Sequence, residues 1–94
     1  MPIPLKLTYH AMKRMRERRV RVRDVVHIVE SGDVIEDYPD DNPFPSQLIS
    51  GTSDGRPLHV VVATDPEDEA RIVITVYDPN PREWNPGFKT RRTP

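Results

Sequence analysis

Residues 58–77, LHVVVATDPEDEARIVITVY, contain two segments of β-strand composition separated by an acidic loop. Residues 58–64 are nearly continuous in valine and apolar side chains, which is typical of a central strand. Residues 72–77 alternate, so that successive side chains point to opposite faces of a sheet. This alternation places three side chains on the face that we expect to be buried, namely Ile72, Ile74 and Val76.

Two further strands are expected on the N-terminal side of this pair. Residues 34–38 form the first, which Pro39 ends, and residues 46–51 form the second. The tetrapeptide Ser53-Asp54-Gly55-Arg56 then predicts a tight hairpin turn before the valine-rich strand. The sequence therefore predicts four antiparallel strands.

Two helices are expected before the strands. Thr8 is a good N-cap, and residues 9–19 contain no Gly or Pro and are rich in Met, Arg, Lys and Glu. Ala11, Met12 and Met15 mark the side of this helix that we expect to face the core. A second helix is expected from residue 23 or 24 to Ser31, with Gly32 as its C-cap.

These elements predict a single α+β domain over residues 1–94, with residues 1–32 helical, 33–78 an antiparallel sheet and 79–94 an irregular basic tail. Two N-terminal helices pack on one face of a four-stranded antiparallel sheet, and the other face lies at least partly open. Further side chains expected in or beside the core are Ala11, Met15, Val25, Val29, Val60 and Val62.

Composition excludes several kinds of site. The chain has no cysteine, so it forms neither a disulfide nor a thiolate metal site. Its three histidines lack metal-ligand spacing, and we expect neither a metal nor a cofactor. No apolar run reaches the roughly 18 residues that a membrane span needs, and the first residues lack a secretory apolar region. We therefore expect a cytoplasmic protein with no membrane partner.

The net charge of −1 conceals a strong polarity along the chain. Residues 1–23 have eight Lys or Arg against one Glu, a net charge of +7, and residues 24–70 have twelve Asp or Glu against one Arg, a net charge of −11. Residues 71–94 return to +3. Either an anionic partner binds the basic segments, or one part of the chain holds another.

His10, Arg14 and Arg18 are spaced four residues apart in the first expected helix. At 100° per residue they lie within about 80° of one another, on a stripe beside the core-facing side. Guanidinium groups bind phosphate oxygens bidentately and an imidazole titrates near neutrality, so this set is suited to metal-free phosphodiester cleavage. The alternative is that the arginines are solvated or pair with carboxylates nearby in sequence, namely Asp33, Glu36 and Asp37.

His59 and Tyr77 are the next candidates, because they lie in the two strands described first. They share a face if the hairpin register pairs them, and a slip of one residue separates them. Each is otherwise a satisfied, half-buried polar residue. The tail mixes aromatic and basic residues, as binders of single-stranded RNA do, although Trp84 and Phe88 are also suited to pinning the tail to the core while the final basic residues fray.

Three motifs taken together resemble a bacterial family of domains of unknown function. They are the helix His10-Ala11-Met12-Lys13-Arg14-Met15-Arg16-Glu17-Arg18, the strand Gly55-Arg56-Pro57-Leu58-His59-Val60-Val61-Val62, and the strand Ile72-Val73-Ile74-Thr75-Val76-Tyr77-Asp78-Pro79. The terminal Trp84, Phe88, Lys89, Arg91 and Arg92 also look like the end of that family, so the resemblance covers nearly the whole chain.

The family is similar to an outlying branch of the barnase/colicin/RelE-type ribonuclease fold, whose members include toxins of type II toxin–antitoxin systems. This resemblance implies a metal-independent endoribonuclease, RNA as substrate and a cognate antitoxin of the zinc-finger kind. It implies His10, Arg14, Arg18 and Tyr77 as catalytic residues and His59, Thr75, Arg91 and Arg92 as substrate-binding residues.

The competing hypothesis is a non-catalytic interaction module. In that case the basic helix binds an acidic partner chain, or the acidic middle of a second copy in a homodimer.

Overall fold

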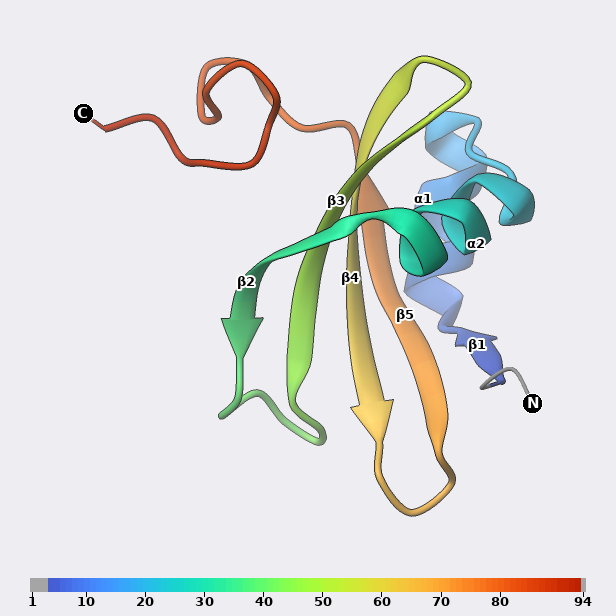
Figure 1. The fold of residues 1–94 in the computed structure, drawn as a ribbon. Coiled ribbons are helices and arrows are strands. Elements are labelled where there is room, and N and C mark those ends of the chain that lie inside the picture. The colour runs from blue at the N-terminus through green and yellow to red at the C-terminus, as the bar shows by residue number, and fades with distance from the viewer. Residues whose placement is uncertain (1–3, 94) are drawn as a thin grey trace.

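Two helices and five strands make up the computed structural model, which describes residues 4–93 (Figure 1). In chain order they are β1 (Leu5–Leu7), α1 (Tyr9–Arg18), α2 (Val22–Ser31), β2 (Asp33–Tyr38), β3 (Ser46–Ser53), β4 (Arg56–Asp65) and β5 (Ala70–Tyr77). Both predicted helices and all four predicted strands are present, and the strands extend by at most two residues beyond the predicted ends. The α+β prediction is confirmed.

The sheet has five strands in the order β1-β5-β4-β3-β2 and is mixed, so the prediction of four antiparallel strands was wrong by one strand. β2 to β5 are antiparallel to their neighbours, whereas β1 pairs in parallel with β5, Leu5 opposite Arg71 and Leu7 opposite Val73. β1 has only three residues, too few to show an alternation in the sequence. Its pairing depends on a partner more than sixty residues away.

Local capping sets the ends of α1. The Thr8 side chain accepts a hydrogen bond of 3.0 Å from the Ala11 amide and donates one of 3.2 Å to the Ile74 carbonyl, which ties the start of the helix to β5. Arg19 ends the helix in the left-handed conformation, with φ of 55°.

Close packing places α2 on the sheet. A Cβ at Gly32, which follows α2, would lie 2.6 Å from the Ile28 carbonyl oxygen and 2.7 Å from the Ser50 carbonyl oxygen, so a larger residue would force the helix end away from β3. The turn at Asp54 and Gly55, both with positive φ, joins β3 to β4 as predicted.

Both helices pack on the same face of the sheet. The six additional core residues predicted from the sequence are all buried there, and they are joined by Val20, Ile28, Ile49, Leu58, Val73 and Val76. The prediction for β5 was partly wrong, because Val76 is buried but Ile72 and Ile74 are only half-buried. The register places Val61 opposite Thr75 and Val62 opposite Val73, so Ile74 is an extra residue in a β-bulge and the alternation shifts there.

The two acidic loops lie at one end of the sheet, and the α1–α2 turn lies at the other (Figure 1). The loops are residues 39–45 between β2 and β3, and residues 66–69 between β4 and β5. After β5 the tail continues on the side away from the helices. None of the helices in the described part of the chain is long and apolar enough to cross a membrane.

The bulge allows a paired test of the packing. Val73→Asp should abolish folding, because it places an unpaired carboxylate in a position with 0% exposure, at a cost of several kcal/mol. Ile74→Asp should still give a folded protein of lower stability, since Ile74 is half-exposed. Circular dichroism and thermal melting distinguish the two, and equal loss of structure in both variants would contradict the assigned bulge.

Candidate functional site

The predicted stripe of His10, Arg14 and Arg18 lies on one flank of α1. Ala11 and Met15 hold the helix in the core with 0% and 6% exposure. The prediction that Met12 also faces the core was wrong, because Met12 lies about 100° from Ala11 around the helix and is 45% exposed. His10 and Arg18 are exposed, and Arg14 is half-buried. Arg14 makes an ion pair of 3.8 Å with Glu17 of the same helix. The arrangement leaves an imidazole and a guanidinium facing solvent on a rigid element.

Asp33 and Glu36, which are near the helix arginines in sequence, pair with other cations in the structure. Asp33 pairs with Lys89 at 2.6 Å, and Glu36 pairs with Arg91 at 2.7 Å. Among the ion pairs of residues 4–93, none involves five cations of α1 and the following turn, namely Lys13, Arg16, Arg18, Arg19 and Arg21. The N-terminal basic segment therefore keeps much of its positive charge free.

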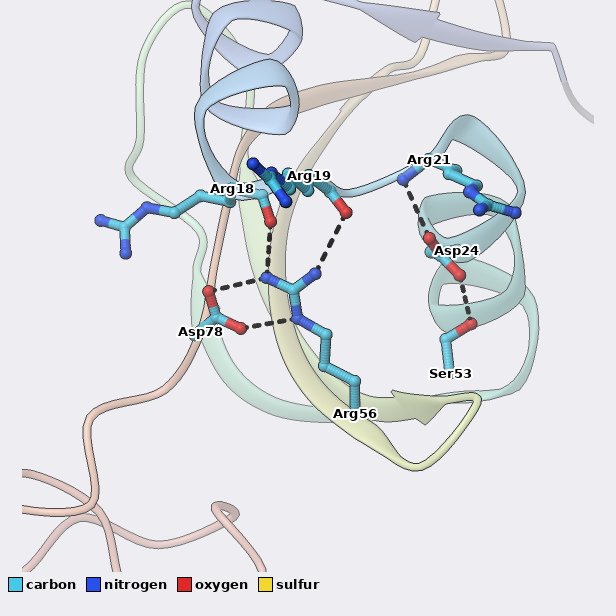
Figure 2. Close-up of polar contacts among 7 residues, drawn as sticks. All are labelled: Arg18, Arg19, Arg21, Asp24, Ser53, Arg56 and Asp78. Atoms are coloured by element: carbon cyan, nitrogen blue, oxygen red, sulfur yellow. Dashed lines mark hydrogen bonds and ion pairs between the residues drawn. The ribbon is translucent and has the colours of Figure 1, made fainter.

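Arg56 of β4 fixes the C-terminal end of α1, and no local sequence pattern marks it for that role, since its partners in α1 are 37 and 38 residues away. Its guanidinium donates to the carbonyls of Arg18 and Arg19 at 2.8 and 3.2 Å and binds both carboxylate oxygens of Asp78 at 2.8 and 2.9 Å (Figure 2). A cation at this position also suits the negative end of the helix. Asp78 follows β5, so one side chain joins α1, β4 and the end of β5.

The Arg56 contact leaves the neighbouring helix arginine free. Figure 2 shows the Arg18 guanidinium pointing away from Arg56 and Asp78, because only the Arg18 carbonyl takes part in the contact. On the α2 side, Asp24 accepts hydrogen bonds from the Arg21 amide at 2.9 Å and from the Ser53 hydroxyl at 2.7 Å. The hydrogen bond from Ser53 lowers the pKa of the Asp24 carboxyl, and the hydrogen bond from the Arg21 amide lowers it further.

His59 and Tyr77 form a second group, on the face of the sheet away from the helices. They are directly opposite in the register, which settles the pairing that the sequence left open. Nδ1 of His59 lies 3.2 Å from the Tyr77 hydroxyl, and Nε2 lies 2.7 Å from the Phe88 carbonyl. Since a carbonyl only accepts, Nε2 has the proton and the Tyr77 hydroxyl donates to Nδ1 of the neutral ring.

The tail seals His59 from solvent. Trp84 lies edge-on to the imidazole with ring centroids 4.6 Å apart, and His59 has 0% exposure. Burial lowers the pKa of the His59 imidazole, against a smaller opposing effect of the hydrogen bond to Phe88. Burial also raises the pKa of the Tyr77 hydroxyl. In this arrangement His59 is a neutral anchor for the tail.

Ion pairs hold the tail against β2. The Arg91 guanidinium makes two hydrogen bonds to Glu36, of 2.7 and 3.0 Å, and lies 4.5 Å from the ring centroid of Trp84. Arg91 lowers the pKa of the Glu36 carboxyl, and Tyr38 also donates to it. Nε of Arg92 donates to the Pro81 carbonyl at 2.7 Å. The positive charge of the tail therefore binds another part of the same chain, which is one of the two explanations that the charge pattern left open. Arg91 and Arg92 are held by these contacts, whereas the sequence also allowed a loose basic end.

The two groups of predicted residues do not meet. α1 packs on the face that Val60 and Val76 share, and His59 and Tyr77 point from the other face by strand alternation. Thr75, two residues from Tyr77 on β5, is half-buried on that same face. Glu36 was missed as a member of the second group, because it is 55 residues from Arg91 and nothing local marks the pair. Within the part of the chain that the structure describes, no cluster of three or more His, Cys, Asp or Glu could hold a metal ion.

The contacts of the Arg56 guanidinium with Asp78 and with the carbonyls of Arg18 and Arg19, which we call the Arg56 clamp, should contribute measurably to the free energy of unfolding. Arg56→Lys retains the charge but loses the planar group that reaches two carbonyls and one carboxylate, so we expect a loss of about 1–2 kcal/mol in the free energy of unfolding. Arg23→Lys is the matched control, since Arg23 makes one exposed ion pair of 3.4 Å with Asp54 and should change stability by less than about 0.5 kcal/mol. Chemical denaturation checks both, and equal effects would contradict the clamp.

Burial of His59 predicts a pH dependence of stability. Because its pKa is below the ordinary 6.5 in the folded protein, the unfolded chain takes up the proton first, and the free energy of unfolding should fall as the pH drops below about 6.5. Glu36 adds a further loss as the pH falls below 4.5. His59→Gln should flatten the dependence between about pH 5 and 7, whereas His27→Gln, at an exposed position, should not. Coincident slopes for wild type and His59→Gln would contradict the assignment.

Comparison with known proteins gives a family but no annotated relative. Neither a curated protein nor a solved structure matches the chain. Residues 7–78, from β1 to the position just after β5, match the family described as "Domain of unknown function (DUF4258)". That description assigns no activity. The match covers well over half of the 94 residues, and the chain therefore belongs to the DUF4258 family of domains of unknown function.

Proposed function

We propose that this domain is a metal-independent endoribonuclease of the toxin type, with RNA bound along the flank of α1. The observation that supports the proposal best is the separation of charge. The turn after α1, which contains Arg19 and Arg21, lies at one end of the sheet, and the two acidic loops lie at the other end (Figure 1). A polyanion can therefore approach the C-terminal half of the helix, which contains Arg14 and Arg18, at a distance from the acidic loops, and the field of the protein favours that approach.

The chemistry that we propose is attack of a 2′-hydroxyl on the adjacent phosphate. The bond from the 2′-oxygen to phosphorus forms as the bond from phosphorus to the 5′-oxygen of the next nucleotide breaks. The products are a 2′,3′-cyclic phosphate and, once the leaving oxygen takes a proton from solvent, a free 5′-hydroxyl. His10 is the proton-transfer group that takes the proton of the 2′-hydroxyl, because its imidazole is exposed on a helix that packs on the sheet. Arg14 and Arg18 bind the phosphate and stabilise the pentacoordinate transition state, whose charge exceeds that of the ground state. Each role uses a side chain that reaches solvent from one flank of α1.

The face away from the helices supplies the second part of the proposal. There we assign Tyr77 and Thr75, which are half-buried, to contacts with RNA beyond the scissile phosphate. His59, which the sequence also suggested for substrate binding, is sealed beneath the tail and can act only by holding the tail in place. Arg91 and Arg92 enter such contacts only if RNA displaces their present partners, Glu36 and the Pro81 carbonyl. Two helices on one face and a partly open face opposite them also agree with the RelE-like fold, which belongs to the proposal together with a neutralising antitoxin.

Cleavage by purified protein in EDTA tests the proposal. Wild type should cleave RNA, and Arg14→Ala should slow cleavage by about 10²-fold or more while binding weakens far less, because the lost interaction is strongest in the transition state. Arg23→Ala, which removes the same charge from an exposed position on α2, should change the rate by less than about threefold. Circular dichroism confirms that both variants are folded.

Two results would contradict the ribonuclease. One is that purified protein leaves every RNA intact, with or without added metal. The other is that Arg14→Ala and Arg23→Ala have the same effect on the rate. The interaction module would then be the better proposal, and the exposed apolar side chains of Tyr9 and Met12 on the same helix favour it.

A further inference from the structure

The tail, residues 79–93, has hydrogen bonds and packing of its own. The Arg92 amide donates to the Glu83 carbonyl at 2.9 Å, which closes this part of the tail into a loop. Within the loop Trp84 and Arg91 form an isolated antiparallel bridge, and the Arg91 guanidinium lies over the Trp84 ring. Because these contacts join tail residues only to one another, the tail can leave the sheet without losing them.

Two hydrogen bonds from the sheet to the tail meet at one oxygen atom. The Phe88 carbonyl accepts a bond of 2.7 Å from Nε2 of His59 in β4 and one of 3.1 Å from the Ser50 hydroxyl in β3. Both donors are buried, and we call these two bonds the Phe88 latch. The left-handed φ of 58° at Phe88 is rare for such a side chain, so this conformation depends on the contacts around it.

Two ion pairs also hold the tail on the sheet, and a polyanion can compete for both. Nζ of Lys89 lies 2.6 Å from Asp33, and the Arg91 guanidinium binds Glu36. The side chains of Lys89 and Arg91 are 59% and 55% exposed, so a phosphate can reach them from solvent. Phosphate oxygens accept the same pair of hydrogen bonds that Glu36 now accepts from Arg91. RNA and the two carboxylates therefore compete for the same cations.

The latched tail covers part of the sheet face that points away from the helices. Trp84 packs against His59, and the Tyr77 hydroxyl is bonded to Nδ1 of that imidazole. The root of the tail is fixed separately, because Asp78 belongs to the Arg56 clamp at the end of α1. Release of the Phe88 latch therefore uncovers Tyr77 while the tail stays attached beside the basic helix.

We propose that the tail is an autoinhibitory arm that is latched on the sheet in this structure and released when single-stranded RNA binds. The released arm offers RNA one aromatic ring and three cations, a combination typical of proteins that bind single-stranded nucleic acid. These residues are Trp84, Lys89, Arg91 and Arg92. RNA favours the released state because only there are Lys89 and Arg91 free of their carboxylates. This inference rests on RNA as the ligand of the proposed function, and it does not require cleavage.

The single tryptophan of the chain reports the position of the tail. We expect Trp84, which is 2% exposed, to become accessible to the quencher acrylamide when a 2′-O-methyl oligouridine of about 12 nucleotides is added. This probe has no free 2′-hydroxyl, so it binds without being cleaved.

A variant with a weakened latch should bind the same probe more tightly. Ser50→Ala removes one bond of the Phe88 latch, and the affinity for the oligouridine should rise by about threefold to tenfold. Ser46→Ala is the matched control, because Ser46 is also buried in β3 but donates to Asp41 instead of the tail. Its affinity should equal that of wild type.

A cross-link between tail and sheet tests the converse, since the chain has no cysteine of its own. Asp33→Cys with Lys89→Cys, joined by a short bis-maleimide, should bind the oligouridine about tenfold or more weakly than the same variant before cross-linking, and Trp84 should stay shielded. Arg23→Cys with Asp54→Cys is the control. It replaces an exposed ion pair of 3.4 Å between α2 and the β3–β4 turn, and its cross-link should change neither readout.

The arm and the ribonuclease fail separately. Equal affinity before and after the tail cross-link, with Trp84 no more accessible in the RNA complex, would overturn the arm and leave cleavage by α1 untouched. A tail cross-link that blocks binding, in a protein that cleaves no RNA, would support the arm and contradict the ribonuclease. Absence of oligouridine binding by both wild type and Ser50→Ala would also refute the arm.

Discussion

The alternation of side chains along β4 is the constraint on which the rest of the structure depends. β4 is hydrogen-bonded to β3 on one side and to β5 on the other, so its register is fixed from both edges. Val60 and Val62 point under the helices, and His59 points to the opposite face. A slip of one residue would place the imidazole beneath α1 and α2 and remove the anchor of the tail.

The positive charges of the two basic segments, residues 1–23 and 71–94, differ in whether they are paired within the domain. In the tail, Lys89 and Arg91 neutralise Asp33 and Glu36, and Arg91 also covers Trp84, so this charge belongs to the folding of the domain. On α1 and the following turn most of the cations face solvent. The turn after α1 and the acidic loops lie at opposite ends of the sheet, whereas α1 begins at the acidic end, where Thr8 and Asp41 line one cavity (Figure 1). This polarity favours oriented encounters with anionic partners.

One helix of ten residues presents three surfaces, because its periodicity of 3.6 residues separates side chains that are neighbours in sequence. Ala11 and Met15 occupy the surface used for folding. His10 with its two arginines and Tyr9 with Met12 occupy the other two, and the packing of the domain requires neither. Thr8 at one end and Arg56 at the other hold the helix, so these free surfaces have fixed positions relative to the sheet.

Local sequence patterns predict the helices, the four longer strands, the hairpin turn and most of the core, because capping, turn chemistry and periodicity are local properties of the chain. They also predict that His10, Arg14 and Arg18 share one flank of α1, and the catalytic role of these three residues stays a prediction. Features that depend on residues far apart in the chain became visible only in the folded protein. β1 required a strand to pair with, and the bulge at Ile74 required a comparison of β5 with β4. The pairing of Arg91 with Glu36 and the reach of Arg56 to the end of α1 join residues 37 to 55 positions apart, and no local pattern encodes such distances.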